Sequence, residues 1–228
     1  MDIKKNILPI RSFSRRSGRM TQSQSHFLKN NFAKWGLASD KIINFDSIFE
    51  KKNPLVLEIG FGMGDSLAKM AADCPDRNFI GVEVHTPGIG RLLSLIEKNS
   101  LNNLRILNGD AADILNKCIA PDTFSRVNIY FPDPWHKNKH HKRRLIRPEF
   151  LILIYKCLKN NGILHIATDW DAYVSYTLNM LNQHDGFSNI AGEKKFVSAR
   201  EYGRPETKFE LRGKKLGHKI WDMVFIKN

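Results

Sequence analysis

Residues 55–65 read LVLEIGFGMGD, an apolar strand that runs into a glycine-rich turn ahead of a predicted helix. Glycine has no Cβ, so a turn built from Gly60, Gly62 and Gly64 lets the backbone approach a ligand closely. A dinucleotide-binding turn would read GxGxxG, but Asp65 occupies the third glycine position, where its charge would repel a pyrophosphate. The stretch therefore predicts a strand-turn-helix unit for a cofactor without phosphates, with a purely structural turn as the alternative.

Outward from this unit, short apolar runs alternate with amphipathic stretches, which predicts β-α-β units on a parallel sheet. We expect seven strands, at residues 55–60, 78–84, 104–109, 127–131, 162–168, 187–191 and 219–226. Helices are expected at residues 65–74, 88–99, 111–118, 148–159, 171–184 and 207–217. Pro148 suits a first helical turn, and Gly162 is expected to act as a helix C-cap. The pattern predicts one α/β domain with helices on both faces of its sheet.

Composition excludes several classes of protein. The 228 residues include 36 Lys and Arg against 23 Asp and Glu, a formal charge of +13 at pH 7. No apolar run approaches the roughly 18 residues that span a bilayer, so we expect no membrane segment. The cysteines Cys74, Cys118 and Cys157 offer neither an even disulfide framework nor a CxxC pair. A reducing, cytoplasmic location fits this cysteine content best.

The positive charge is concentrated in two segments. Residues 1–30 hold seven basic side chains and one acidic, and residues 136–147 hold six basic and no acidic. Such segments favour a polyanionic partner, because each phosphate contact releases condensed counterions. A solvated face plus a tail is the alternative.

The first of these segments is expected to be an arm. Arg15, Arg16 and Arg19 lie in an Arg- and Ser-rich, acid-poor stretch in which Gly18 would interrupt a helix. We expect residues 1–30 to form a flexible, RNA-contacting arm on a single domain formed by the rest of the chain, residues 31 to 228. A mitochondrial transit peptide has a similar composition and is the alternative.

Acidic residues occur near the ends of three successive predicted strands: Glu58, Glu83 and Asp110. Ligands of open α/β sheets bind outside the carboxyl ends of the strands. A carboxylate at Glu83 can accept both hydroxyls of a ribose, and Asp110 can accept the amino group of an adenine. S-adenosylmethionine has both groups and positive charges that would favour nearby carboxylates. Any one of the three could instead be a surface acid or a helix N-cap.

The fourth strand is followed by FPDPW, residues 131–135, in which two prolines flank Asp133. The prolines restrict the local backbone and so fix the direction of that carboxylate. The basic segment follows directly, so the cofactor and polyanion sites should adjoin. His136 and His140 lack the Glu of a HExxH metal site, and we expect no metal.

At this point the chain resembles the bacterial tRNA (guanine-N7)-methyltransferases, S-adenosylmethionine-dependent enzymes of the class I methyltransferase fold. The resemblance covers nearly the whole chain, through RSFSRRSGRMT (11–21), LEIGFGMG (57–64), GVEVH (81–85), GDA (109–111), FPDPWHKNKHHKRRL (131–145), ATDW (167–170) and RPETKFELRGKKLGHKIWD (204–222). It implies a Rossmann-like, seven-stranded, mostly parallel sheet with an antiparallel last strand. FPDPW with KRRL and the late TKFE are the specific motifs, whereas many methyltransferases share the glycine turn.

The resemblance also implies roles for individual residues. The cofactor would be contacted by Glu58, Glu83, Asp110 and Asp133, with Asp133 also at the reacting centre. The substrate nucleoside would be engaged by Lys137, Asp169, Thr207, Lys208, Phe209 and Glu210. The RNA would be bound by Lys139, His140, His141, Lys142, Arg143 and Arg144. This sequence departs from the family pattern at His136, where proline is expected, and at Lys139, where arginine is more usual.

The implied reaction is methylation of the guanine at position 46 in the tRNA variable loop. Guanine N7 has a free lone pair and no proton to lose, so the chemistry is mainly positioning. Asp133 would stabilise positive charge that moves toward the purine. Thr207 and Glu210 could close the pocket, form a helix capping box, or do both.

Two alternatives remain at the level of sequence. The first is a methyltransferase that acts on the amine of adenine or cytosine, because FPDPW is similar to the (D/N)PP(Y/F/W) motif of those enzymes. The second is an RNA-binding protein that retains only the methyltransferase fold. We expect tRNA as partner and no obligatory protein partner, with monomer and homodimer both open.

Overall fold

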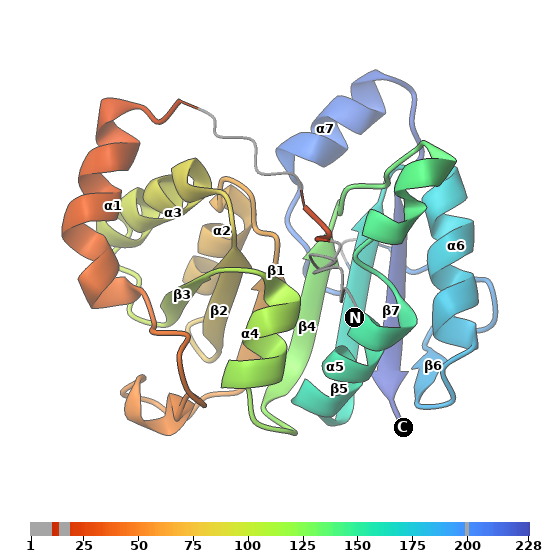
Figure 1. Cartoon of the computed structure of the whole chain (residues 1–228), viewed down its shortest axis with the longest axis horizontal. Coiled ribbons are helices and arrows are strands. Elements are labelled where there is room, and N and C mark those ends of the chain that lie inside the picture. The colour runs from red at the N-terminus through yellow and green to blue at the C-terminus, as the bar shows by residue number, and fades with distance from the viewer. Residues whose placement is uncertain (1–10, 14–18, 199–200) are drawn as a thin grey trace, which may run out of the picture.

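The computed structural model, which describes residues 11–13, 19–198 and 201–228, is built around a seven-stranded sheet of order β3-β2-β1-β4-β5-β7-β6 (Figure 1). Its strands are β1 (Leu55–Ile59), β2 (Asn78–Glu83), β3 (Leu104–Asn108), β4 (Phe124–Tyr130), β5 (Leu158–Thr168), β6 (Phe187–Asn189) and β7 (Trp221–Lys227). Strands β1 to β5 are parallel, and β7 runs antiparallel to both β5 and β6. The predicted mostly parallel sheet with an antiparallel last strand is confirmed.

The sheet separates two hydrophobic cores, because successive side chains of a strand point to opposite faces. Leu57 and Ile59 of β1 lie in the core beneath α4, α5 and α6, whereas Val56 lies in the core beneath α1, α2 and α3. The helices are α1 (Gln22–Trp35), α2 (Asp65–Asp73), α3 (Thr86–Lys98), α4 (Ala111–Cys118), α5 (Pro148–Cys157), α6 (Asp171–Asn182) and α7 (Lys208–Lys215). Helices cover both faces, as predicted. Within the described ranges, no helix is both long enough and apolar enough to cross a membrane.

Helix α1 begins inside the segment expected to be an arm and was missed at the level of sequence. Thr21 and Gln24 form a reciprocal capping box at its start. It packs closely on α3 at Gly90, where an added Cβ would lie 2.3 Å from the carbonyl oxygen of Gln24. At its other end the indole of Trp35 donates to Glu97 at 2.6 Å. Two 3₁₀ helices, η1 (Phe45–Ser47) and η2 (Asn138–Arg143), were also missed.

The junction between α5 and β5 corrects one prediction. Pro148 begins α5 as expected, but α5 ends at Cys157, and Gly162 lies within β5 instead of acting as a C-cap. The reason is that Leu158 is fully buried and pairs with Phe124, so the strand starts earlier. The chain then bulges before pairing resumes, with Asn161 at a φ of 61°.

Candidate functional site

The glycine turn lies at the carboxyl edge of the parallel strands, between β1 and α2. Gly60, Gly62 and Gly64 all have positive φ, at 75°, 58° and 78°. A side chain is strained in that conformation, and a Cβ at Gly64 would also lie 2.8 Å from Leu92 of α3. Backbone geometry therefore requires glycine at these positions.

Glu83 at the end of β2 fixes this turn. Its carboxylate accepts hydrogen bonds from the backbone nitrogens of Gly62 at 2.8 Å, Val84 at 2.7 Å and His85 at 3.0 Å. An ionised carboxylate offers about four acceptor positions, so the three bonds leave capacity for a ligand hydroxyl. Glu83 is 9% exposed.

Glu58 is the second acid beside the turn, and it is buried. Only 3% of the residue is exposed, and its Oε2 has no hydrogen-bond partner among the residues that the structure describes. Burial raises the pKa of Glu58 to about 8, against the opposing charge of Arg126 and with a further contribution from Glu83. A positive charge placed beside this oxygen would favour the ionised form of the carboxyl group.

Asp110 follows β3 and caps helix α4. Its Oδ1 accepts from the backbone nitrogen of Ala112 at 2.9 Å, so the helix N-cap considered from sequence is present. The residue is half-buried at the same edge of the sheet as Glu83. The three acids thus lie on neighbouring strands, and Glu83 is the one that bonds directly to the glycine turn.

The loop after β4, residues 131–135, holds Asp133 in an exposed position. Phe131 and Trp135 have φ values of 50° and 48°, in the left-handed region that non-glycine residues rarely adopt. Such strain persists only where the surroundings enforce it. Phe131 donates its backbone N–H to Ala167 at 2.7 Å, and the indole of Trp135 donates to the carbonyl of Ser12 at 3.3 Å.

Arg144 also holds this loop. It was expected to bind RNA, but it is 4% exposed, and its Nε donates to the carbonyl of Pro134 at 3.0 Å. Its guanidinium lies over the rings of Tyr173 and Tyr176, 5.4 and 4.4 Å from their centroids. Burial against these two rings places the guanidinium behind the loop of residues 131–135.

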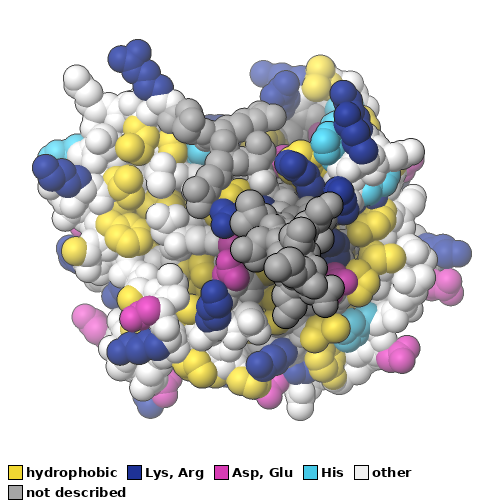
Figure 2. Space-filling model, viewed as in Figure 1, with side chains coloured by type: hydrophobic (Ala, Val, Ile, Leu, Met, Phe, Trp, Pro, Cys, Tyr) yellow, Lys and Arg dark blue, Asp and Glu magenta, His cyan; other side chains and the backbone are white. Residues whose placement is uncertain are grey.

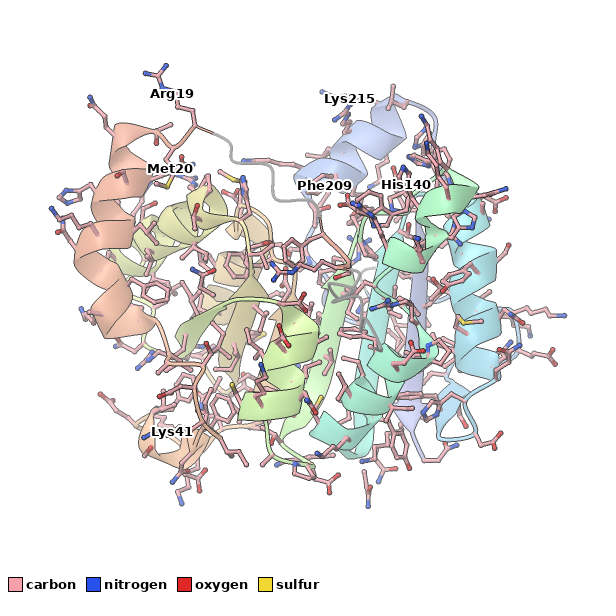
Figure 3. All side chains as sticks on the ribbon, viewed as in Figure 1. Arg19, Met20, Lys41, His140, Phe209 and Lys215 are labelled. Atoms are coloured by element: carbon pink, nitrogen blue, oxygen red, sulfur yellow. The ribbon has the colours of Figure 1, made fainter. Side chains whose placement is uncertain are left out.

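Helix α7 covers the glycine turn. Lys208 donates to Asp65 at 3.1 Å, and Phe209 stacks on Phe131 with centroids 6.2 Å apart and planes inclined by 20°. Figure 3 shows Phe209 on the side of α7 that faces the sheet, although the residue is still 60% exposed. Thr207 caps the helix by accepting from the backbone nitrogen of Glu210 at 3.1 Å.

The other two predicted substrate residues on this side differ in exposure. Glu210 is buried, with its carboxylate bonded to Arg204 at 2.6 Å and to Lys214 at 2.7 Å, so only one half of the expected capping box forms. Asp169, after β5, is half-buried and lies 3.1 Å from Nδ1 of His218. An added Cβ at Gly213 of α7 would lie 2.9 Å from the Asp169 carboxylate, so the helix and this acid are in close contact.

The basic segment forms η2 beside residues 131–135, which we call the reaction loop because it carries Asp133, the residue predicted to be at the reacting centre. Lys137, Lys139 and Lys142 are exposed, and the guanidinium of Arg143 and the ring of His140 lie 5.1 and 5.8 Å from the ring of Trp135. Figure 2 shows Lys and Arg side chains gathered on this face over η2 and α7.

Of the remaining predicted RNA-binding residues, His141 is half-exposed in η2 and Arg19 is exposed just before α1. Arg15 and Arg16 lie outside the described residues. Over the part of the chain that the structure describes, no group of three or more His, Cys, Asp and Glu side chains is arranged to hold a metal ion.

Sequence reasoning missed three residues that build the site. Phe131 was quoted only as part of a motif, and its stacking on Phe209 depends on the fold. Asp65 was interpreted as repelling phosphates, yet Lys208 and Arg91 pair with it. Arg204 was not singled out. The sequence did offer a signal for it, because Asp222 lies within the apolar last strand and a buried acid there needs a cationic partner such as Arg204.

Known proteins similar to this chain include methyltransferases over most of its length. The family model described as "Putative methyltransferase" matches residues 52–223. The tRNA (guanine-N(7)-)-methyltransferase of Alcanivorax borkumensis is 50% identical over 219 residues, covering 96% of this chain and 91% of the relative. The protein of that name from Pseudomonas aeruginosa is 46% identical over 217 residues, covering 95% and 88%.

The similarity to solved structures concerns the fold alone. The 16S rRNA methyltransferase KamB superposes with a TM-score of 0.60 at 13% identity, covering 82% of this chain and 95% of that one. An antibiotic-related methyltransferase gives 0.55 at 15% identity, covering 84% and 98%. With nearly full-length relatives at up to 50% identity, this chain belongs to the tRNA (guanine-N(7)-)-methyltransferase family.

Proposed function

We propose that the chain transfers a methyl group from S-adenosylmethionine to N7 of a guanine in tRNA, the guanine at position 46 of the variable loop, to give 7-methylguanosine. The observation that carries the proposal is the meeting of three features at one edge of the sheet. These are the glycine turn with Glu58 and Glu83, the exposed carboxylate of Asp133, and the basic helix η2. A cofactor site and a polyanion site therefore share one reaction centre.

The chain's own residues suit this cofactor. The turn from Gly60 to Gly64 would take its amino acid portion, Glu83 its ribose hydroxyls and Asp110 its adenine. The unpaired buried oxygen of Glu58 would face its positive charges. When bound, S-adenosylmethionine supplies a methyl group on a positively charged sulfur.

Asp133 acts on the nucleophile. Guanine N7 has a lone pair and loses no proton, so the residues at the centre hold and orient the base and do not deprotonate it. Correct placement of the reacting atoms can account for about 7 to 11 kcal/mol of barrier reduction. The carboxylate of Asp133, fixed by the strained loop from 131 to 135, orients the purine edge and stabilises the positive charge that develops on it.

Aromatic residues provide the surface for the base. Phe209 is 60% exposed and stacks on Phe131, which lies two positions before Asp133 in the loop after β4. Stacking of a base on such a ring contributes about 1 to 3 kcal/mol. Because N7 of this guanine takes part in tRNA tertiary pairing, the base must turn outward before it reaches the ring.

The phosphate backbone is met by η2 and by the N-terminal arm. Lys139, Lys142 and Arg143 are accessible next to the reaction loop. The hydrogen bond from the indole of Trp135 to the carbonyl of Ser12 brings residues 11–13, in the N-terminal arm, to the same place. We place the tRNA across these elements.

The test is incorporation of labelled methyl groups into unmodified tRNA, followed by nucleoside digestion. The expected product is 7-methylguanosine, and a transcript with adenine at position 46 should accept no label. A 6-methyladenosine product would instead identify an amino methyltransferase. Calorimetry that showed tRNA binding without S-adenosylmethionine binding would identify a non-catalytic RNA-binding protein.

A further inference from the structure

A single buried guanidinium, that of Arg204, joins three elements around the proposed reaction site. Its Nε and Nη2 donate to the two oxygens of Asp222 on β7, at 2.6 and 2.9 Å. Its Nη1 donates to Oε2 of Glu210 on α7 at 2.6 Å. All three side chains are at most 3% exposed.

The same guanidinium also contacts the end of β4. Its carbon lies 5.7 Å from the ring centroid of Tyr130 and 5.5 Å from that of Phe131. Phe131 is the residue on which Phe209 stacks, and it precedes Asp133 by two positions. Arg204 therefore reaches the covering helix through Glu210 and the reaction loop through Phe131.

Strand β7 holds this guanidinium in a fixed direction. Oδ1 of Asp222 is also 2.7 Å from Nε2 of His165, and Nδ1 of His165 is 2.7 Å from Nη2 of Arg126. Burial lowers the pKa of His165, more than its bond to Asp222 raises it, so the imidazole is neutral at pH 7. A neutral ring that accepts from Arg126 at Nδ1 must donate from Nε2 to Asp222, which anchors the carboxylate.

We propose that Arg204 is a positioning residue that holds α7 over the reaction site in register with the loop that carries Asp133. The inference rests on the proposed function. It acts through Glu210 and Phe131 and does not touch the reacting atoms. Only a planar guanidinium can bind one carboxylate at two points and a second one at the same time, so lysine does not replace it. A buried ion pair often adds little to the stability of a fold, because desolvation of the charges offsets their attraction. We therefore assign the Arg204 ion pairs to orienting α7.

The test compares Arg204→Lys with a matched control, Lys227→Met. Like Arg204, Lys227 is a buried cation, 6% exposed, but it is the last residue of β7, pairs with Asp122 at 2.8 Å, and lies at the opposite end of that strand from Asp222. Hydrogen exchange of the α7 amides is measured on the protein alone. Turnover numbers and KM values for tRNA are measured in parallel with calorimetric binding of S-adenosylmethionine.

We expect Arg204→Lys to lose exchange protection in α7 while β1 to β4 stay protected, and to lower kcat/KM for tRNA by at least about tenfold. Lys227→Met should lower Tm but leave α7 protection and kcat/KM close to those of the parent protein. Full protection of α7 in folded Arg204→Lys, or an equal loss of kcat/KM in both variants, would overturn the inference.

A second variant covers the case in which Arg204→Lys does not fold. Glu210→Gln keeps the bonds between Arg204 and Asp222 and weakens only the link to α7, so it should show the same gain in α7 exchange. Unchanged exchange in Glu210→Gln overturns the inference as well. Because exchange needs no tRNA, its result stands even if 7-methylguanosine is not the product, and the two proposals can fail separately.

Discussion

The ammonium of Lys208 lies 3.1 Å from Oδ2 of Asp65 and joins the first residue of α7 to the first residue of α2, 143 positions away in the chain. This contact spans the glycine turn. Burial alone would raise the pKa of Asp65, but hydrogen bonds from Lys208 and Arg91 outweigh it and lower the pKa. The acid at the third glycine position is therefore an ionised anchor for the covering helix.

Lys208→Met tests that anchor. Lys208 is 74% exposed, so the loss should change the free energy of unfolding by less than about 1 kcal/mol. If the contact helps to hold α7 closed, KM for tRNA should rise about two- to fivefold, within the same energy range. Lys69→Met removes a similarly exposed bridge, to Asp73 at 2.8 Å within α2, and should leave KM unchanged. Equal effects in the two variants would exclude a specific role for the Lys208 contact.

Asp133→Ala should separate chemistry from RNA binding. We expect a loss of several kcal/mol of transition-state stabilisation, on the order of a thousandfold in single-turnover rate, because the developing charge on the purine loses its carboxylate. The Kd for tRNA should change little, since phosphate contacts dominate binding. Near-normal turnover in Asp133→Ala would remove Asp133 from the reaction centre.

The RNA surface is tested by replacing Lys139, Lys142 and Arg143 together by alanine. The slope of log K against log salt for tRNA binding should become less steep by about 0.7 to 0.9 for each phosphate contact removed. The control replaces three exposed lysines outside η2 and α7: Lys51, Lys52 and Lys98. A slope that changes in the control and not in the η2 variant would move the RNA surface to another face.

Arg144→Met should behave unlike the η2 variants, because Arg144 is buried behind the loop. Loss of its charge-assisted hydrogen bond to the carbonyl of Pro134 should destabilise the protein by about 1.5 to 3 kcal/mol. Turnover should fall through loosening of the loop, while the salt dependence of tRNA binding stays the same. A less steep salt dependence of tRNA binding in Arg144→Met would show that Arg144 contacts the RNA.

Glu58→Gln should change how stability depends on pH. Burial raises the pKa of Glu58 from its ordinary value near 4.5 to about 8, so the folded state binds a proton that the unfolded state releases. The free energy of unfolding should therefore fall as pH rises from about 4.5 to about 8 and level off above, by a few kcal/mol at about 1.4 kcal/mol per unit. Denaturant titrations across this range should show a shallower dependence for Glu58→Gln, and parallel curves would contradict the assignment.

Local sequence patterns were sufficient to predict the sheet and the edge at which the acidic residues lie. Alternation of apolar runs fixed the order of strands and helices, and because parallel strands end at one edge, Glu58, Glu83 and Asp110 had to lie near the glycine turn. The same logic placed Asp133 there, since it follows the next strand directly. The local pattern was sufficient because the place of each acid follows from where its own strand ends.

Only the tertiary structure decided which charged side chains face solvent and which support the site. Arg143 and Arg144 are neighbours in a basic run, yet the first lies over Trp135 beside the site and the second is buried against two tyrosines of α6. Glu210 and Arg204 likewise turned inward, because Asp222 on the distant strand β7 offers a buried carboxylate to the same guanidinium. Burial of a charge depends on partners far along the chain, and that is the information that a local pattern of residues does not contain.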